Sequence, residues 1–198
     1  MLQIVNSEEL QDAFDKIWMK VYSEKNYDLE PYQGKDVYRF LVQHKQNNSY
    51  VGTIEIILNY CKNGNSYEQL FPFSKLDEVS EHINKVIIIQ KISIKSELQR
   101  EGYLEFLLYT LYILTKQYNL KYGIAFIEPK LYLALKMIYS ISVKKVGNKF
   151  LYKGDVVIPV VIDLHNTLNR ENEITWLKNT KNIIESNFKP DQITHFVD

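Results

Sequence analysis

Six consecutive residues, Gln99-Arg100-Glu101-Gly102-Tyr103-Leu104, have the types and the order that could bind a phosphate group. They follow an apolar, β-branched run, Val86–Ile94, and they open a long stretch in which apolar residues recur at helical spacing. A glycine-containing turn between a strand and a helix leaves backbone N–H groups unpaired, and the helix dipole adds positive charge at the same place. The turn therefore predicts an anion site, to which Arg100 could add a charged contact.

The elements that must position this turn follow from the spacing of apolar residues. Helical spacing predicts helices at residues 7–24, 74–84, about 99–118, 129–139 and 171–187. Alternating or continuous apolar runs predict strands at residues 37–43, 49–59, 86–94, 122–127, 143–146 and 155–164. The first two strands are joined by polar turn residues and should form a hairpin. The strand at 86–94 is nearly all apolar, so we expect it in the centre of a sheet with both faces covered.

The order of these elements predicts an α/β (α+β) fold in which helices flank a mixed central sheet. The chain has 198 residues, of which 45% are hydrophobic, and this suits a single domain over residues 1–198. The C-terminal helix at about 171–187 could pack on the domain or on a partner, so a homodimer is one expectation. Pro159 removes a ladder donor from the last strand, which predicts a sheet edge or a bulge there.

The charge balance and the N-terminal sequence argue against several classes of protein. With 24 basic and 24 acidic residues the net charge is zero, so no basic field favours nucleic acid as a partner. No apolar stretch of about 18 residues, the length that a membrane span needs, occurs in the sequence. The N-terminus lacks the pattern of a signal peptide, and the single cysteine, Cys61, cannot form a disulfide within the chain. We therefore expect a cytoplasmic protein without a membrane segment.

Metal and nucleotide chemistry are not indicated by the remaining residues. None of the four histidines is spaced from another ligand type as in a zinc site, which needs three or four convergent ligands. Cys61 has no motif around it that would make it a thiol nucleophile. Neither G-x-x-x-x-G-K-[ST] nor G-x-G-x-x-G occurs, so the usual nucleotide-binding loops are absent. We expect no metal site.

The turn resembles the Q/R-x-x-G-x-G/A pyrophosphate loop of the GNAT acyltransferases, which bind acyl-coenzyme A. Gln99 and Gly102 match this pattern, and Leu104 stands where the family usually has Gly or Ala. The predicted order of elements is also that of GNAT folds. The resemblance implies an N-acyltransferase that moves an acyl group from acetyl-CoA or another acyl-CoA to a primary amine.

Within that superfamily, residues 10–165 look like the acyl-homoserine-lactone synthases and the N-acyl amino acid synthases. The matching pieces are Val21-Tyr22-Ser23-Glu24, Tyr50-Val51-Gly52-Thr53 and Ile127-Glu128-Pro129. The chain departs from those synthases at Ile88, where they usually have a glutamate three residues before a basic residue. This likeness implies a small-molecule amine or amino acid as the acceptor, and an acyl carrier protein as a further donor.

The resemblance also implies which residues bind the donor. In GNAT enzymes the diphosphate lies on the N–H groups of the turn, and the pantetheine arm adds to the backbone of the central strand where two strands separate. Transferred to this sequence, the phosphates would contact Gln99, Arg100, Glu101, Gly102, Tyr103 and Leu104. The pantetheine arm would contact Ile92, Ser93 and Ile94.

Acyl transfer to an amine requires a neutral amine and a proton for the leaving thiolate. The resemblance indicates a tyrosine late in the helix after the fifth strand as the acid, and Tyr139 is the nearest match, with Tyr132 as the alternative. Glu55, on the strand after Gly52, is the candidate base. Both residues also have a structural interpretation, because the chain contains 15 tyrosines and a single strand glutamate is often solvated. Glu128 could cap the helix that Pro129 begins.

Two other functions remain open from the sequence. A catalytically inactive GNAT-fold module for binding or regulation is favoured by the departures at Ile88 and Leu104. A signal synthase that depends on an acyl carrier protein would have a long apolar acyl tunnel and a basic patch, formed by Lys91, Lys95 and Arg100.

Overall fold

The computed structural model describes residues 2–30, 36–60 and 65–187. Its strands are β1 (Leu2–Ile4), β2 (Val37–Gln43), β3 (Tyr50–Ile57), β4 (Val86–Ile94), β5 (Tyr122–Ile127), β6 (Val143–Lys145), β7 (Phe150–Tyr152) and β8 (Asp155–Asp163). Its helices are α1 (Glu8–Glu24), α3 (Asn65–Leu70), α4 (Asp77–Ser80), α5 (Tyr103–Tyr118), α6 (Pro129–Met137), α7 (Leu164–Asn169) and α8 (Thr175–Asn187).

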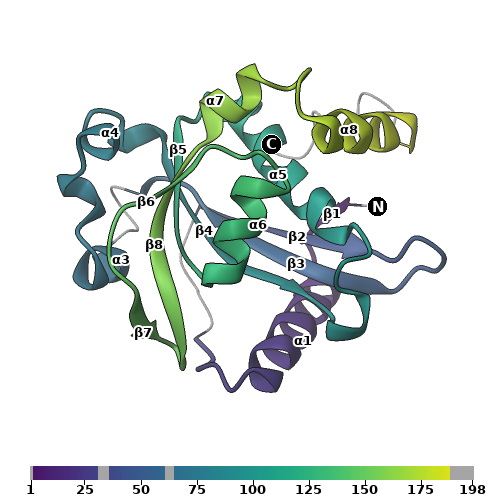
Figure 1. Cartoon of the computed structure of the whole chain (residues 1–198). Coiled ribbons are helices and arrows are strands. Elements are labelled where there is room, and N and C mark those ends of the chain that lie inside the picture. Colours follow the sequence, from purple (N-terminus) through teal and green to yellow (C-terminus); the bar gives the residue numbers. More distant parts are fainter. Residues whose placement is uncertain (1, 31–35, 61–64, 188–198) are drawn as a thin grey trace.

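The strands form one mixed sheet in the order β1-β2-β3-β4-β5-β8-β6, and β7 pairs with β8 beside it. β4 and β5 are parallel, and the other neighbouring strands are antiparallel. Helix α1 packs on one face of the sheet, and α5 and α6 lie on the other (Figure 1). This mixed sheet between helices confirms the predicted fold class.

The two faces of the sheet are covered by separate hydrophobic clusters. On the α1 face, Phe14, Trp18 and Leu41 are fully buried together. On the α5 face, Leu107 and Leu114 of that helix are fully buried against apolar residues of the central strands. Because packed interiors resist displacement, the strands between these two clusters hold their side chains in fixed positions.

The parallel pair at the centre of the sheet separates partway along its length. β4 and β5 pair from Val86 and Tyr122 only as far as Ile88 and Ile124, and β5 continues its pairing with β8 alone. On its other side β4 has a bulge, where its register against β3 shifts and Lys91 has a positive φ of 50°. The bulge bends β4 away from β5, and the space between the two strands opens at this point.

Several element boundaries differ from the sequence prediction. The helix predicted from about residue 99 begins at Tyr103, because Gly102 takes a left-handed conformation that ends the turn. The helix predicted at 74–84 is only α4, flanked by short 3₁₀ turns, and the C-terminal helix begins at Thr175. The short strands β1 and β7 were not predicted, since three residues give no readable alternation.

Pro159 lies inside the sheet instead of at its edge. β8 is bordered by β5 on one side from Ile158 to Asp163, and on the other side by β7 up to Val157 and by β6 from Val160. Pro159 falls between these two partners, where its missing N–H group leaves no break in either ladder. In the described residues no helix is long and apolar enough to cross a membrane.

Candidate active site

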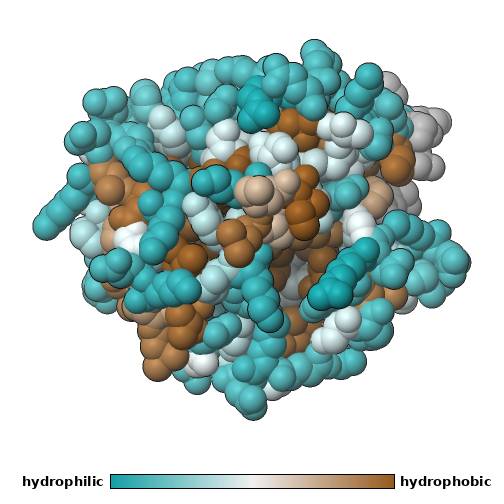
Figure 2. Space-filling model, viewed as in Figure 1, coloured by the Kyte–Doolittle hydropathy of each residue, from teal (hydrophilic) through white to brown (hydrophobic). Residues whose placement is uncertain are grey.

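A cavity of about 100 Å³ lies where β4 and β5 separate. Figure 2 shows this face of the molecule hollowed beside α6, with apolar side chains inside the hollow and hydrophilic ones along its rim. The cavity is lined by Val21, Tyr22, Lys25, Tyr27, Tyr67, Ile89, Gln90, Lys91, Ile92, Phe126, Ile127, Glu128, Leu131, Tyr152, Lys153, Asp155 and Val157. These residues come from the end of α1, the splayed strands, α3, α6 and the β7–β8 hairpin.

A tyrosine hydroxyl lies between two carboxylates in this cavity. The Tyr27 hydroxyl is 2.5 Å from Asp155 Oδ2 and 2.8 Å from Glu128 Oε1. Burial raises the pKa of Tyr27, and the hydrogen bonds to Asp155 and Glu128 raise it further, so the hydroxyl keeps its proton. One hydroxyl can donate only one proton at a time, so the two carboxylates share the Tyr27 donor. Each also accepts from a second group, Glu128 from Lys25 Nζ and Asp155 from the Val156 N–H. The cluster is therefore suited to share and pass a proton.

The backbone explains why these three side chains meet. Glu128 is the N-cap residue of α6, directly before Pro129 at the first helical position. Asp155 begins β8 after the tight turn formed by Lys153 and Gly154, which both have positive φ. A Cβ at Gly154 would lie 2.6 Å from the Asn26 carbonyl oxygen, so only glycine lets the hairpin approach the loop that holds Tyr27.

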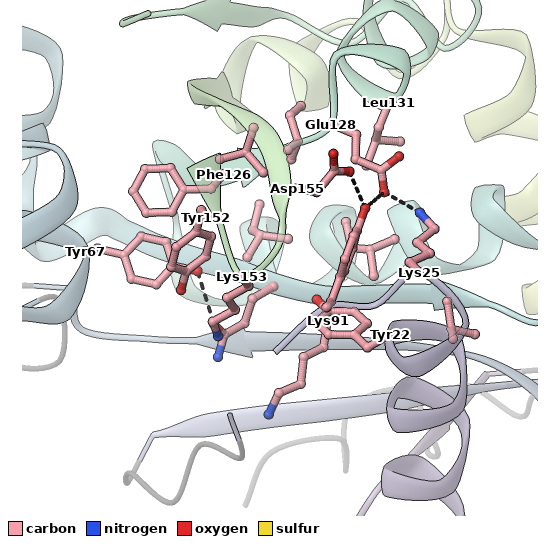
Figure 3. A pocket seen from close by; sticks show the side chains of 17 residues that line it. Tyr22, Lys25, Tyr67, Lys91, Phe126, Glu128, Leu131, Tyr152, Lys153 and Asp155 are labelled. Carbon is pink, nitrogen blue, oxygen red and sulfur yellow. Dashed lines mark hydrogen bonds and ion pairs between the residues drawn. The ribbon is translucent and has the colours of Figure 1, made fainter. Parts of the chain in front are cut away.

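The charges in the cavity leave one anion without a cationic partner. Lys25 forms an ion pair with Glu128, and Lys153 Nζ lies 3.0 Å from Glu30 Oε2. Glu128 and Asp155 point toward one another in Figure 3, and the Lys91 side chain points away from both. Within the described ranges no lysine, arginine or histidine forms an ion pair with Asp155. Asp155 is therefore the group in this cavity that a ligand cation could neutralise.

Glu55, predicted as the base, is not among the residues that line the cavity. Its fully buried carboxylate lies 2.9 Å from Lys91 Nζ and 2.5 Å from Arg39 Nε. Gln90 Nε2 donates to the same carboxylate at 2.6 Å. Burial lowers the pKa of Lys91, and the neighbouring Glu55 acts in the opposite direction. This arrangement favours a positioning role, in which Glu55 holds Gln90 and Lys91 in the cavity wall.

Tyr139, predicted as the acid, is also not among the lining residues, and neither is Tyr132. The Tyr139 ring packs edge-on against Trp176 of α8 at 5.7 Å between ring centroids, and Trp176 Nε1 donates to the Tyr139 carbonyl at 2.7 Å. Burial raises the pKa of Tyr139. The structure thus brings neither predicted catalytic residue into the cavity, and brings in Tyr27, Glu128 and Asp155 instead.

The turn predicted to bind phosphate lies at the C-terminal end of β4 and leads into α5. Gly102 is the N-cap of α5 with a φ of 80°, and no side chain caps it. In the part of the chain that the structure describes, the N–H groups of Gly102, Tyr103 and Leu104 donate to no protein acceptor. The Gln99 side chain donates to the Ile94 carbonyl at 3.3 Å and so ties the turn to the end of β4.

A lysine that the sequence gave no reason to select lies beside this turn. Lys45, from the loop between β2 and β3, donates from Nζ to the Glu101 carbonyl at 2.6 Å. The same ammonium lies 5.1 Å from the centroid of the Tyr103 ring. Arg100 is exposed with a positive φ of 71°. Two cations therefore accompany the unpaired amides.

The three residues predicted along the pantetheine arm alternate in direction. Ile92 lines the cavity and Ile94 is half-buried, whereas Ser93 is buried on the opposite face, paired with Thr53. The basic patch predicted from Lys91, Lys95 and Arg100 does not form, because Lys91 is only 5% exposed. Among the described residues no group of three or more His, Cys, Asp or Glu side chains could hold a metal ion.

No family model and no curated protein sequence matches the chain. Solved structures do match. The N-acyl amino acid synthase FeeM from uncultured soil microbes aligns with a TM-score of 0.65 at 13% identity, over 84% of this chain and 92% of FeeM. The AHL synthase LasI aligns with a TM-score of 0.63 at 13% identity, over 83% and 89% of the two chains. MesI, a CoA-dependent acyl-homoserine lactone synthase, gives a TM-score of 0.58 at 10% identity, over 87% and 94%. The chain therefore has the GNAT fold that its sequence predicted.

Proposed function

We propose that this protein is an N-acyltransferase that transfers an acyl group from acyl-coenzyme A to a primary amine. The observation that supports this proposal best is the cavity where β4 and β5 separate. It lies between a turn with unpaired amides, which suits the donor's diphosphate, and an unneutralised carboxylate, which suits a cationic amine.

The donor would lie along β4. Its diphosphate would accept hydrogen bonds from the N–H groups of Gly102, Tyr103 and Leu104, with Lys45 and Arg100 close enough to the turn to add positive charge. The pantetheine arm would run back along β4 past Ile94 and Ile92, where β5 no longer pairs with the strand. The thioester would then reach the cavity.

The acceptor would bind as an ammonium at Asp155. Transfer of one proton from the ammonium to the carboxylate gives a neutral amine, whose lone pair attacks the thioester carbonyl. The C–N bond forms, the attacking nitrogen loses its second proton to solvent, the C–S bond breaks, and the thiolate leaves. The Tyr27 hydroxyl connects Asp155 with Glu128, so the proton taken from the amine could return through this cluster to the thiolate.

The unpaired amides favour coenzyme A over an acyl carrier protein as the donor. Coenzyme A has a diphosphate that can occupy several N–H groups at once, whereas the phosphopantetheine of a carrier protein has one phosphodiester. MesI, one of the similar structures, is a CoA-dependent synthase. Because acyl-coenzyme A is made inside cells, the proposal includes a cytoplasmic location.

A second candidate is a GNAT-fold module that binds coenzyme A without catalysis. It is favoured by the placement of Glu55, which is enclosed by Lys91, Arg39 and Gln90, and of Tyr139, which packs on Trp176. In this alternative the acidic cluster would serve only to attach the β7–β8 hairpin to the end of α1.

Thermal denaturation and a thiol-release assay separate these candidates. At 100 to 1,000 times its Kd, acetyl-CoA should add about 2.7–4.1 kcal/mol of stability. An acyltransferase should also release thiol with a member of an amine panel, and Asp155→Asn should lower kcat/KM at least tenfold while the affinity for coenzyme A stays unchanged. Glu173→Gln, an exposed ion-pair residue at a distance from the cavity, is the matched control. Stabilisation without turnover would favour the binding module, and no stabilisation would exclude both.

A further inference from the structure

A second cavity, of about 280 Å³, lies on the other side of one wall of the candidate active site. The two cavities share four lining residues, namely Tyr67, Gln90, Tyr152 and Lys153. The second cavity extends to Ile57 and Ile88 of the sheet and to Leu70 of α3. In Figure 3, Tyr67, Phe126 and Tyr152 gather on the side of the active site away from Lys25.

The shared wall is held in place by stacking and by hydrogen bonds. The Tyr67 ring stacks on Phe126 with 4.9 Å between centroids and 7° between planes, and Tyr152 packs edge-on against the same Phe126 at 5.3 Å. The Tyr67 hydroxyl donates to Gln90 Oε1 at 3.1 Å, and Gln90 Nε2 donates to Glu55 at 2.6 Å. Glu55 is itself held by two cations, so Tyr67 is fixed through Gln90 to a buried ion cluster.

If the proposed function holds, the donor runs along β4 from the diphosphate turn, and its acyl end reaches this shared wall. The diphosphate turn is at the C-terminal end of β4, and the arm would run from Ile94 toward Gln90. Beyond Gln90 the gap closes, because β4 and β5 are paired again at Ile88 and Ile124. The acyl group must therefore leave the strand beside Gln90, where Tyr67 forms the wall.

The volume of the first cavity limits the size of that acyl group. One water-sized atom needs about 10–15 Å³ of cavity volume. The first cavity, at about 100 Å³, therefore holds roughly seven to ten such atoms. The sulfur, carbonyl and methyl of an acetyl thioester together with an amine nitrogen account for about five of them. An octanoyl chain would need six more heavy atoms, which exceeds what remains.

We propose that Tyr67, supported by Gln90, restricts the donor to short acyl groups, and that the second cavity receives a longer chain only when the Tyr67 ring is removed. Tyr67 is then a specificity-determining residue. Stacking on Phe126 keeps its ring across the opening, and the hydrogen bond to Gln90 orients its hydroxyl.

Calorimetric titration with acetyl-CoA and octanoyl-CoA tests this proposal without a known acceptor. The wild-type protein should bind acetyl-CoA at least tenfold more tightly than octanoyl-CoA. Tyr67→Ala should shift the ratio of the two affinities at least tenfold toward octanoyl-CoA. Tyr67→Phe, which keeps the ring and loses only the hydroxyl, is the matched control and should keep the preference for acetyl-CoA.

Two results would overturn the proposal. One is a wild-type protein that binds octanoyl-CoA as tightly as acetyl-CoA, and the other is a ratio that Tyr67→Ala leaves within threefold of wild type. If Tyr67→Ala does not fold, Tyr152→Ala is the second variant, because the half-buried Tyr152 ring belongs to the same wall. It should also shift the ratio of the two affinities at least tenfold toward octanoyl-CoA. Failure of coenzyme A itself to bind the wild-type protein would instead refute the proposed function, so the two failures are distinguishable.

Discussion

The substitution Glu55→Gln tests whether Glu55 holds buried cations or moves a proton. The side chain is fully buried, and Lys91, whose ammonium lies 2.9 Å from it, is only 5% exposed. Glutamine keeps the shape of the side chain but removes the charge, which leaves the Lys91 ammonium in the interior without its anion. Breaking a buried ion pair by removing one partner costs about 3–5 kcal/mol.

The pKa of Lys91 sets an independent upper limit on this loss. The lysine can relieve the unpaired charge by losing its proton, and its unperturbed pKa is about 10.4. At 1.36 kcal/mol per pH unit, deprotonation at pH 7 costs about 4.6 kcal/mol, and at pH 9 it costs about 1.9 kcal/mol. The folded variant then binds one proton fewer than its unfolded state, so its stability rises with pH. The difference in the free energy of unfolding between variant and wild type should therefore shrink as the pH is raised.

Urea denaturation at pH 7 and pH 9, followed by tryptophan fluorescence, measures this difference. The fluorescence of Trp18 is a local probe, since Lys91 Nζ lies 4.7 Å from its ring. We expect a loss of about 3–4.6 kcal/mol at pH 7 that falls to at most about 1.9 kcal/mol at pH 9. The double variant Glu55→Gln/Lys91→Met is the control, and it should recover most of the stability because no buried ammonium is left without its anion. Arg39, the other cation beside Glu55, is 20% exposed and also donates to Gln11 Oε1. A loss below about 1 kcal/mol that does not depend on pH, combined with loss of turnover, would contradict a positioning role and favour Glu55 as a base.

Three further predictions concern the surroundings of the site. Tyr139→Phe should change kcat less than twofold in the thiol-release assay, because the ring packs on α8 outside the cavity; a loss of tenfold or more would support an acid role. Gly154→Ala should lower stability in urea by about 1–3 kcal/mol, through its φ of +88° and its 2.6 Å approach to the Asn26 carbonyl; an unchanged midpoint would argue against this packing. The hydrogen bond from Lys144 lowers the pKa of Glu78, and burial acts in the opposite direction. Because the pKa is lowered in the folded state, the ionised Glu78 stabilises the fold above about pH 4, and this stabilisation is lost as the pH falls through the lowered pKa. Denaturation midpoints of Glu78→Gln and wild type should therefore differ at pH 7 and converge at pH 3.

The longer strands and helices and the turn at residues 99–104 were predictable because they depend on local sequence, whereas the short elements β1, α3, β7 and α7 were not predicted. Apolar runs identified β4, and the glycine at 102 marked the point at which α5 could begin. The bulge at Lys91 was not predictable, since a lysine with positive φ is set by the ion cluster around it and not by its own preference.

The acidic cluster depends on tertiary contacts that the sequence does not encode locally. Tyr27 and Asp155 are 128 positions apart, and they meet because the β7–β8 hairpin packs on the loop after α1. The only local signal was the pair Lys153-Gly154, a two-residue turn that starts a strand at an acidic residue. Strand alternation correctly placed Glu55 and Thr53 on one face, but it gave no information about Arg39, which is opposite Glu55 in the next strand.

The proposed donor site requires that the amides at residues 102–104 bind the diphosphate of the donor. Wild-type protein and Gly102→Val should be titrated in a calorimeter with coenzyme A and with pantetheine, which lacks the diphosphate. We expect wild type to bind coenzyme A at least a hundredfold more tightly than pantetheine, and Gly102→Val, strained at its φ of +80°, to lose most of that difference. Equal affinity of the wild-type protein for the two ligands, or a variant that binds coenzyme A like wild type, would contradict the proposed donor site.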